Sequence, residues 1–215
     1  MGRRERNKLE KLRRITSAAK ELFATKGFAQ TTTQEIAERA DIGTGTLFLY
    51  AKSKEDLLIM VFKDEMIETS QAAFRKISST PSLIDQLMEV FGSMIAYHNR
   101  DVGLAKVLIK EITILASPER RNDLRELMKI VYDGIGDLIV SGQKAGKIRA
   151  SVDPQTAAEN LFGIYYINLI GWLGGMATKR QFLSRLRPML TLAIEGLAAD
   201  RREAPAPRAK ALRKA

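Results

Sequence analysis

Apolar side chains recur every three or four residues along most of the chain, which is the spacing of one face of an α-helix. The first stripe ends at Gly27. Its members are Leu9, Leu12, Ile15, Ala19, Leu22 and Phe23. No segment shows the alternation of a half-buried strand, so the pattern predicts an all-helical protein.

Short polar segments divide the helical pattern into separate elements. Thr32 stands three residues before Glu35, which is a capping box that begins a short helix over about 33–40. Another short helix is expected over 44–50, and Ser53 can cap a long fourth helix. Further breaks lie at 79–82, 117–120 and 142–154. Residues 80–199 are therefore expected to form four or five helices.

The stretch "DIGTGTLFLYAKSKEDLL", residues 41–58, is unusual inside a helical chain. Gly43 and Gly45 lie where a helix is expected, and each glycine costs about 1 kcal/mol relative to alanine in a helix interior. Two short helices held against a longer one have the organisation of a helix-turn-helix. There the glycines let the second short helix approach DNA closely, and Asp41 can adopt the left-handed conformation of the turn. A helical hairpin whose glycines serve only the turn is the alternative.

The distribution of charge favours a nucleic-acid partner. Of the net charge of +10, residues 1–54 contribute 12 Lys and Arg against 6 Asp and Glu, and residues 200–215 contribute 6 against 2. The intervening region is neutral overall. Before the first apolar stripe, Arg3 and Arg4 begin a basic arm of the kind that lies along phosphates or enters the minor groove. A solvated basic tail is the alternative for that arm.

Composition excludes several kinds of site. The chain has no cysteine and one histidine, His98, so it offers neither disulfides nor a site that needs two imidazoles. The charged N-terminus lacks an apolar signal core, which predicts a cytoplasmic protein. Residues 160–178 contain no charge and raise the possibility of a membrane span, but their glycines, asparagines and tyrosines favour a helix buried between a core and a partner subunit.

Residues 18–58, "AAKELFATKGFAQTTTQEIAERADIGTGTLFLYAKSKEDLL", resemble the TetR (TetR/AcrR) family of bacterial regulators. The resemblance implies an all-α homodimer. A three-helix DNA-binding domain with its basic arm would occupy 1–54, and a helical ligand-binding and dimerisation domain would occupy 55–199. Residues 200–215 are expected to form a disordered basic tail.

The resemblance also implies which residues contact DNA. Thr33 and Lys54 take the positions of phosphate contacts, and Thr44 and Thr46 face the major groove. Phe48 stands where the family often has a tyrosine, so one phosphate-binding hydroxyl is missing. The complete expected set is Arg3, Arg4, Thr33, Gly43, Thr44, Gly45, Thr46, Phe48, Leu49, Tyr50 and Lys54.

Two further sets of candidates lie in the neutral half. The ligand pocket is expected to be lined by Phe91, Met94, His98, Leu115, Tyr132, Tyr165, Asn168 and Trp172. Each of these side chains fits an ordinary core position equally well. The last two helices resemble the family's dimerisation pair, which forms a four-helix bundle across a two-fold axis. The expected interface consists of Leu161, Gly171, Phe182, Leu186, Leu190, Ala193 and Leu197.

Three function classes follow. The leading hypothesis is a repressor that binds a palindromic DNA operator as a dimer and is released by a small apolar or aromatic molecule, without a cofactor or metal. An enzyme using carboxylates such as Glu111 or Asp133 is disfavoured by the single histidine and the lack of a phosphate-binding glycine loop. A sequence-independent DNA-binding protein would suit the two basic ends but leaves the neutral apolar half without a purpose.

Overall fold

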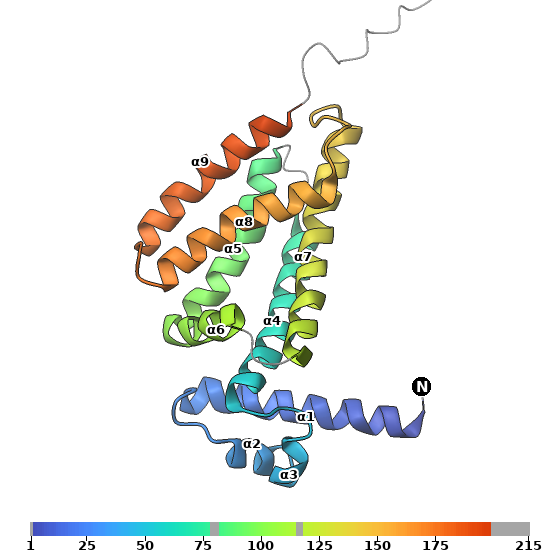
Figure 1. Ribbon diagram of the computed structural model, residues 1–215, viewed down its shortest axis with the longest axis vertical. Coiled ribbons are helices and arrows are strands. Elements are labelled where there is room, and N and C mark those ends of the chain that lie inside the picture. Colours follow the sequence, from blue (N-terminus) through green and yellow to red (C-terminus); the bar gives the residue numbers. More distant parts are fainter. Residues whose placement is uncertain (1, 78–81, 115–117, 199–215) are drawn as a thin grey trace, which may run out of the picture.

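The structure is a computed structural model that describes residues 2–77, 82–114 and 118–198. Within these residues the chain is helical, as the apolar spacing predicts, and the one β-bridge is isolated (Figure 1). The helices of the described residues are α1 (Arg3–Lys26), α2 (Thr33–Arg39), α3 (Thr44–Leu47), α4 (Lys54–Lys76), α5 (Leu83–Arg100), α6 (Val102–Ile114), α7 (Pro118–Lys144), α8 (Pro154–Leu173) and α9 (Lys179–Leu197).

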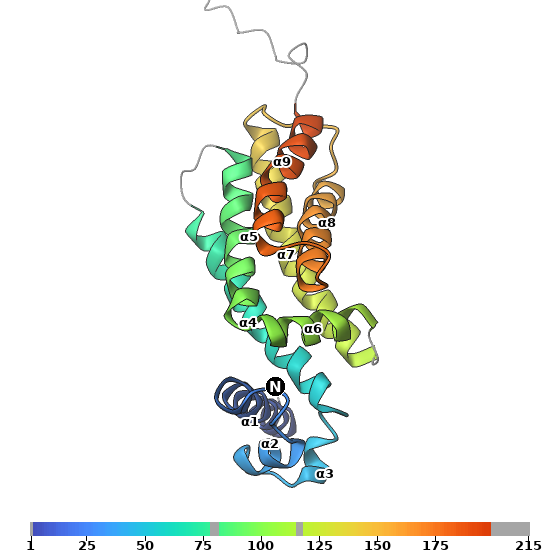
Figure 2. The same cartoon turned by 90° about the vertical axis from the view of Figure 1, so that its left-hand side faces the viewer.

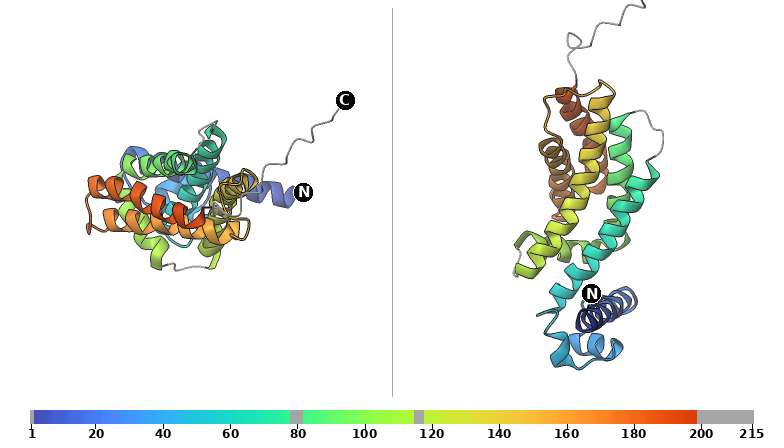
Figure 3. Two further views of the ribbon diagram at one scale, coloured as in Figure 1. Left: turned by 90° about the horizontal axis from the view of Figure 1, so that it is seen from above. Right: turned by 90° about the vertical axis from the view of Figure 1, so that its right-hand side faces the viewer.

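The helices form two parts joined by α4. Helix α1 lies across one end of the molecule with α2 and α3 beneath it, and α4 rises from there into a bundle with α5 to α9 (Figures 1 and 2). The small part is held by one side of α1, where Ile15, Ala19 and Phe23 are buried together with Ile36 of α2 and Leu47 of α3. In the bundle, α4 and α7 pack against each other along much of their length (Figure 3, right).

The local helix signals of the sequence are present in the structure. The Thr32 hydroxyl accepts a hydrogen bond from the Glu35 amide at 3.2 Å, and the Thr32 amide donates to the Glu35 carboxylate at 2.9 Å. Ser53 likewise accepts from the Asp56 amide at 3.1 Å. Asp41 has a φ of 52°, the left-handed conformation expected at this turn.

Two expected boundaries differ from the structure. The basic arm is not separate from the first helix, because α1 already begins at Arg3. Neither proline nor glycine interrupts residues 3–26, and the Arg, Lys, Glu and Leu residues there favour helix. The short helix expected over 44–50 ends at Leu47. The residues up to Tyr50 continue as a tighter turn, with backbone hydrogen bonds between residues three apart.

The neutral half forms the bundle of α5 to α9. Helix α8 contains most of the uncharged run 160–178, and no described helix is long and apolar enough to cross a membrane. The expected domain boundary after residue 54 falls at the first residue of α4, so the two parts share a continuous helix rather than a flexible linker. The expected basic tail at 200–215 lies outside the described residues.

His98, the single histidine of the chain, is buried in the bundle core. It is 3% exposed, and its Nδ1 atom has no hydrogen-bond partner among the described residues. The ring contacts are aromatic, with Phe62 at 5.9 Å and Tyr97 at 5.5 Å between centroids. Burial disfavours the charged imidazolium and lowers the pKa of His98 from 6.5 to about 4.

The buried neutral imidazole predicts a loss of stability in mild acid. The unfolded chain takes up a proton near pH 6.5 while the folded chain resists protonation down to about pH 4. The contribution of His98 is therefore complete above that upper value and falls as the pH approaches the lower one, by about 3 kcal/mol in total. Urea unfolding across this range should show a smaller loss of unfolding free energy for His98→Phe than for the wild type. Equal losses in the two proteins would contradict the prediction.

Candidate functional site

The residues expected to read DNA gather at the exposed end of the small part. Gly43, the N-cap of α3, and Gly45 within α3 are exposed, and Thr44 and Thr46 are half-buried beside them. Leu47 is fully buried and anchors this short helix from within. Thr33 is the first residue of α2. Directly after α3, Phe48 and Leu49 are exposed and Tyr50 is half-buried.

Nothing within the protein requires glycine at positions 43 and 45. A Cβ atom built on either residue would meet no atom within 4 Å, and neither residue has a positive φ. Gly27 differs, because its φ of 85° ends α1 in a conformation that favours glycine. The two glycines of the α3 segment therefore leave open space on the outer surface instead of relieving a clash inside the fold.

Ion pairs hold α2 and the following turn against α1. Arg39 binds the Glu21 carboxylate through two nitrogens at 2.6 and 3.1 Å, and Arg14 pairs with Asp41 at 3.3 Å. Lys26 binds Glu35, and this hydrogen bond together with those from Thr32 lowers the pKa of Glu35 to about 2. These cations are neutralised within the fold, so they add little to an external positive surface.

Several cations without an ion pair among the described residues gather on the first half of α1. The structure gives no ion pair among the described residues to Arg3, Arg4, Arg6, Lys8, Lys11 and Arg13. Arg4, Lys8 and Lys11 recur at helical spacing and line a groove with Leu49 and Tyr50, which follow α3. The expected DNA contacts of the arm and of the α3 segment thus share one surface, although about 45 residues separate them in the chain.

Lys54 occupies an intermediate position. Its Nζ atom donates to the carbonyl oxygens of Phe28 at 2.7 Å and Ala29 at 3.2 Å, and it lies 4.5 Å from the centre of the Phe28 ring. An ammonium group has three donors, so one remains for another partner. The side chain therefore ties the start of α4 to the loop between α1 and α2, whatever else it contacts.

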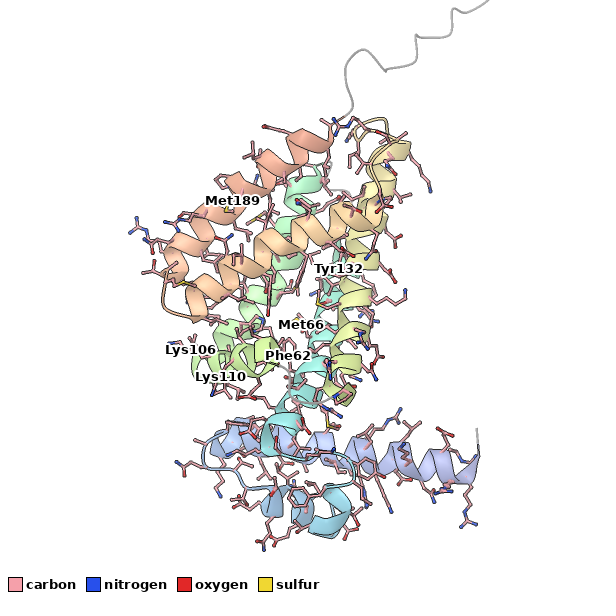
Figure 4. The ribbon with its side chains drawn as sticks, in the orientation of Figure 1. Phe62, Met66, Lys106, Lys110, Tyr132 and Met189 are labelled. Carbon is pink, nitrogen blue, oxygen red and sulfur yellow. The ribbon has the colours of Figure 1, made fainter. Side chains whose placement is uncertain are left out.

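The bundle contains an apolar cavity of about 350 Å³, partly open to solvent, between α4, α5, α6, α7 and α8. In Figure 4, Phe62 and Met66 lie on α4 and Tyr132 lies on α7, so the walls come from helices that are far apart in the sequence. The lining is almost entirely apolar or aromatic, and Glu159 of α8 is its one carboxylate among the described residues. Such a cavity suits an apolar molecule rather than a charged one.

The expected pocket residues divide into two groups. Those that line the cavity are Met94, His98, Tyr132 and Tyr165. Phe91 lies behind the wall, where it stacks on the Tyr165 ring at 4.7 Å. Asn168 of α8 donates to Met189 Sδ of α9 at 3.4 Å and Trp172 packs on Phe182, so both serve the α8–α9 contact. Leu115 lies outside the described residues.

Several lining residues were not among the candidates. They are Phe62, Met66, Ile109, Ile112, Leu124, Leu127, Met128, Val131, Glu159, Phe162, Gly163, Tyr166 and Leu169. Most are aliphatic residues whose helical spacing matches that of ordinary core positions. Phe62 and Met66, one turn apart on α4, offered a usable signal, because the apolar run 57–62 is too broad to face a single neighbour.

The expected dimer residues differ in how deeply they are buried within the protomer. Leu161, Phe182, Leu186 and Leu190 are fully buried inside the protomer, where α8 and α9 pack on the rest of the bundle. Gly171, Ala193 and Leu197 are half-buried. The apolar side chains that these two helices and their connecting turn expose are Ile167, Met176, Leu183, Met189 and Leu192. The most regular apolar stripe of these helices therefore packs inside the protomer, and a different set of apolar side chains faces outward.

Known proteins share both parts of this architecture. Residues 15–61 match the family described as bacterial regulatory proteins, tetR family. The fatty acid metabolism regulator protein of Bacillus subtilis is 27% identical over 168 residues, which cover 78% of this chain and 86% of that protein.

Two solved structures resemble nearly the whole molecule. FadR of Thermus thermophilus, a TetR-family repressor in complex with lauroyl-CoA, has a TM-score of 0.68 and 25% identity over 91% of this chain and 98% of its own. FadR of Bacillus subtilis, in complex with stearoyl-CoA, has a TM-score of 0.61 and 23% identity, over 86% of this chain and 99% of its own. These similarities and the exposed helix-turn-helix indicate a regulator rather than an enzyme. The chain belongs to the TetR family and is a ligand-responsive, DNA-binding transcriptional regulator.

Proposed function

We propose that this protein is a cytoplasmic transcriptional repressor that leaves its operator when its bundle binds a long-chain acyl-CoA thioester. The observation that carries the proposal is the apolar cavity of about 350 Å³ between α4 and α8. Its walls of Leu, Ile, Met, Phe and Tyr suit an alkyl chain. The FadR proteins with lauroyl-CoA and stearoyl-CoA have the same fold, which supports an acyl thioester over other apolar ligands.

Electrostatics favours one route for the headgroup of such a ligand. Helix α6 contributes Ile109 and Ile112 to the cavity wall and carries Lys106 and Lys110 on its exposed outer side (Figure 4). The structure gives neither lysine an ion pair among the described residues. Glu159 on α8 places negative charge on another part of the wall. The phosphates of the ligand's headgroup are therefore attracted to the lysines of α6 and repelled by the carboxylate of α8.

The DNA-bound form is a dimer in this proposal. Two copies of the α3 segment would enter successive major grooves about 34–36 Å apart on a palindromic operator. The α8–α9 face, which we define by the exposed side chains Ile167, Met189 and Leu192, supplies the apolar surface for the partner subunit. The two helices lie side by side along one side of the bundle (Figure 3, left), as a four-helix interface requires.

Ligand release is the direct test of the function. The operator is first selected from random DNA with the purified protein. Palmitoyl-CoA should then release the protein from this operator, because the ligand favours a state that binds DNA poorly. Fluorescence anisotropy of the labelled operator measures this. Coenzyme A alone should have no effect. The double variant Lys106→Ala/Lys110→Ala should weaken the binding of palmitoyl-CoA more than the binding of palmitate. Lys144→Ala, at the far end of α7, should change the binding of neither ligand. Binding of palmitoyl-CoA without loss of operator affinity would refute the function.

Gly45→Ala separates DNA contact from folding. The added methyl group meets no atom within 4 Å, so the free energy of unfolding should stay the same or rise by up to about 1 kcal/mol. Operator affinity should fall by about tenfold or more, since the methyl group keeps the α3 backbone away from DNA.

The matched control for this variant is Gly92→Ala in α5, which also adds a methyl group in open space. It should leave operator affinity unchanged. If Gly45→Ala binds the operator like the wild type, the glycine of α3 does not serve close approach to DNA.

Leu192→Glu tests the α8–α9 face. Leu192 is 72% exposed, so glutamate there should be tolerated by the folded protomer. A negative charge opposite its own copy in an apolar interface should convert the dimer to monomers and weaken operator binding together with it. Sedimentation velocity measures the mass, with the exposed Ala145→Glu as a control for added charge. A dimer of unchanged stability would place the interface elsewhere.

A further inference from the structure

A second cleft lies where α1 meets the bundle. It also has a volume of about 350 Å³ and is formed by α1, α4, α5 and α6. Its apolar lining consists of Phe23, Ala24, Leu58, Val61, Leu104, Ala105 and Leu108. We call it the junction cleft, because α1 belongs to the DNA-binding part and the other helices continue into the bundle. A molecule in this cleft would contact both parts of the protein.

Polar contacts close the rim of the junction cleft. Lys20 of α1 pairs with Glu65 of α4 at 2.8 Å. The Tyr97 hydroxyl of α5 donates to the same carboxylate, also at 2.8 Å. One carboxylate thus holds the DNA-binding helix α1 and the bundle helix α5 together. A molecule that separates Lys20 from Glu65 removes one of the contacts between α1 and the bundle.

His98 is the residue that the linings of the cavity and the junction cleft share among the described residues. Its neighbours face the two spaces in pairs: Val61 lines the cleft and Phe62 the cavity, and Leu108 lines the cleft and Ile109 the cavity. The two spaces are therefore separated by about one layer of side chains. At its centre are the rings of His98, Phe62 and Tyr97, with centroids 5.5 to 5.9 Å apart.

No hydrogen bond among the described residues holds the imidazole of this ring cluster in place. Tyr97 is held by its hydrogen bond to Glu65, whereas the buried Nδ1 atom of His98 has no partner. Rotation of the imidazole breaks no hydrogen bond at that atom. A buried polar atom without a partner is unfavourable and is retained in proteins for a reason. A movable ring between two spaces provides such a reason.

We propose that His98 is a movable partition, and that an acyl chain long enough to displace it extends from the cavity into the junction cleft and contacts α1. This inference rests on the proposed function, because it assumes an acyl chain in the cavity. Short chains remain behind the partition. Long chains reach Phe23 and Ala24 and press against the Lys20–Glu65 pair, so chain length determines how strongly the ligand acts on the DNA-binding part.

The absence of cysteine from the chain allows a direct test. Ala24→Cys places a single thiol in the junction cleft, and Ala29→Cys places one on the exposed loop after α1 as the matched control. The probes are hexadecyl-CoA and octyl-CoA thioethers, which cannot acylate the thiol. The rate of maleimide labelling at saturating ligand reports whether the cleft is occupied, and calorimetry on the same proteins reports whether the ligand binds.

Hexadecyl-CoA should slow the labelling of Ala24→Cys by about tenfold, a protection of about 1.4 kcal/mol. Octyl-CoA should bind without slowing it, and Ala29→Cys should label at one rate throughout. If hexadecyl-CoA binds and the Ala24→Cys thiol labels at its free rate, the chain does not enter the cleft and the inference is wrong. If neither thioether binds the wild type, the acyl-CoA ligand class itself fails, and the inference fails with it.

Substitutions of His98 move the result in opposite directions. His98→Ala removes the partition and should raise the affinity for hexadecyl-CoA relative to octyl-CoA, since each additional buried methylene strengthens binding by about fourfold. His98→Trp enlarges the partition and should abolish protection of the cleft thiol while octyl-CoA still binds. Lys144→Ala changes an exposed residue that lines neither space and should not change protection. Equal chain-length preference in all three variants would overturn the role of His98.

Discussion

The burial of α4 is the constraint on which the rest of the structure depends. Its residues 57–62 are all buried, although a surface helix buries only one stripe. This burial is possible because α1 packs on its first turns and α5, α6 and α7 pack around its continuation. Ser53 caps the helix directly after the DNA-binding segment. Any displacement of α4 by the bundle therefore acts directly on α1, which packs against α4.

Charged groups strengthen this connection at the point where the two parts meet. Arg120 at the start of α7 is 7% exposed and lies 4.0 Å from Asp56 in the first turn of α4, and it binds Asp123 at 2.6 Å. Lys63 of α4 reaches Glu126 at 3.2 Å. Partly buried ion pairs of this kind are costly to break singly, because the remaining charge is left without a partner. They make α4 and the first turns of α7 move together.

The cavity lies directly beside these contacts. Leu124 and Leu127 of α7 line it, one turn after Arg120 and Asp123, and Phe62 lines it next to Lys63. A ligand that spreads the walls acts on the same turns that carry the ion pairs. The Lys20–Glu65–Tyr97 contacts add a second connection on the α1 side. Ligand binding and DNA binding thus share structural elements, which is what coupling between two sites requires.

The sequence by itself determined the features whose causes are local. Helix caps at Thr32 and Ser53, the left-handed turn at Asp41 and the helix-turn-helix around Gly43 and Gly45 depend on neighbouring residues, and all are present in the structure. The tertiary structure alone decided which apolar stripe of α8 and α9 faces inward, which side chains line the cavity, and that His98 separates two spaces. These outcomes depend on helices that are distant in the chain, and helical spacing identifies an apolar face without naming what covers it.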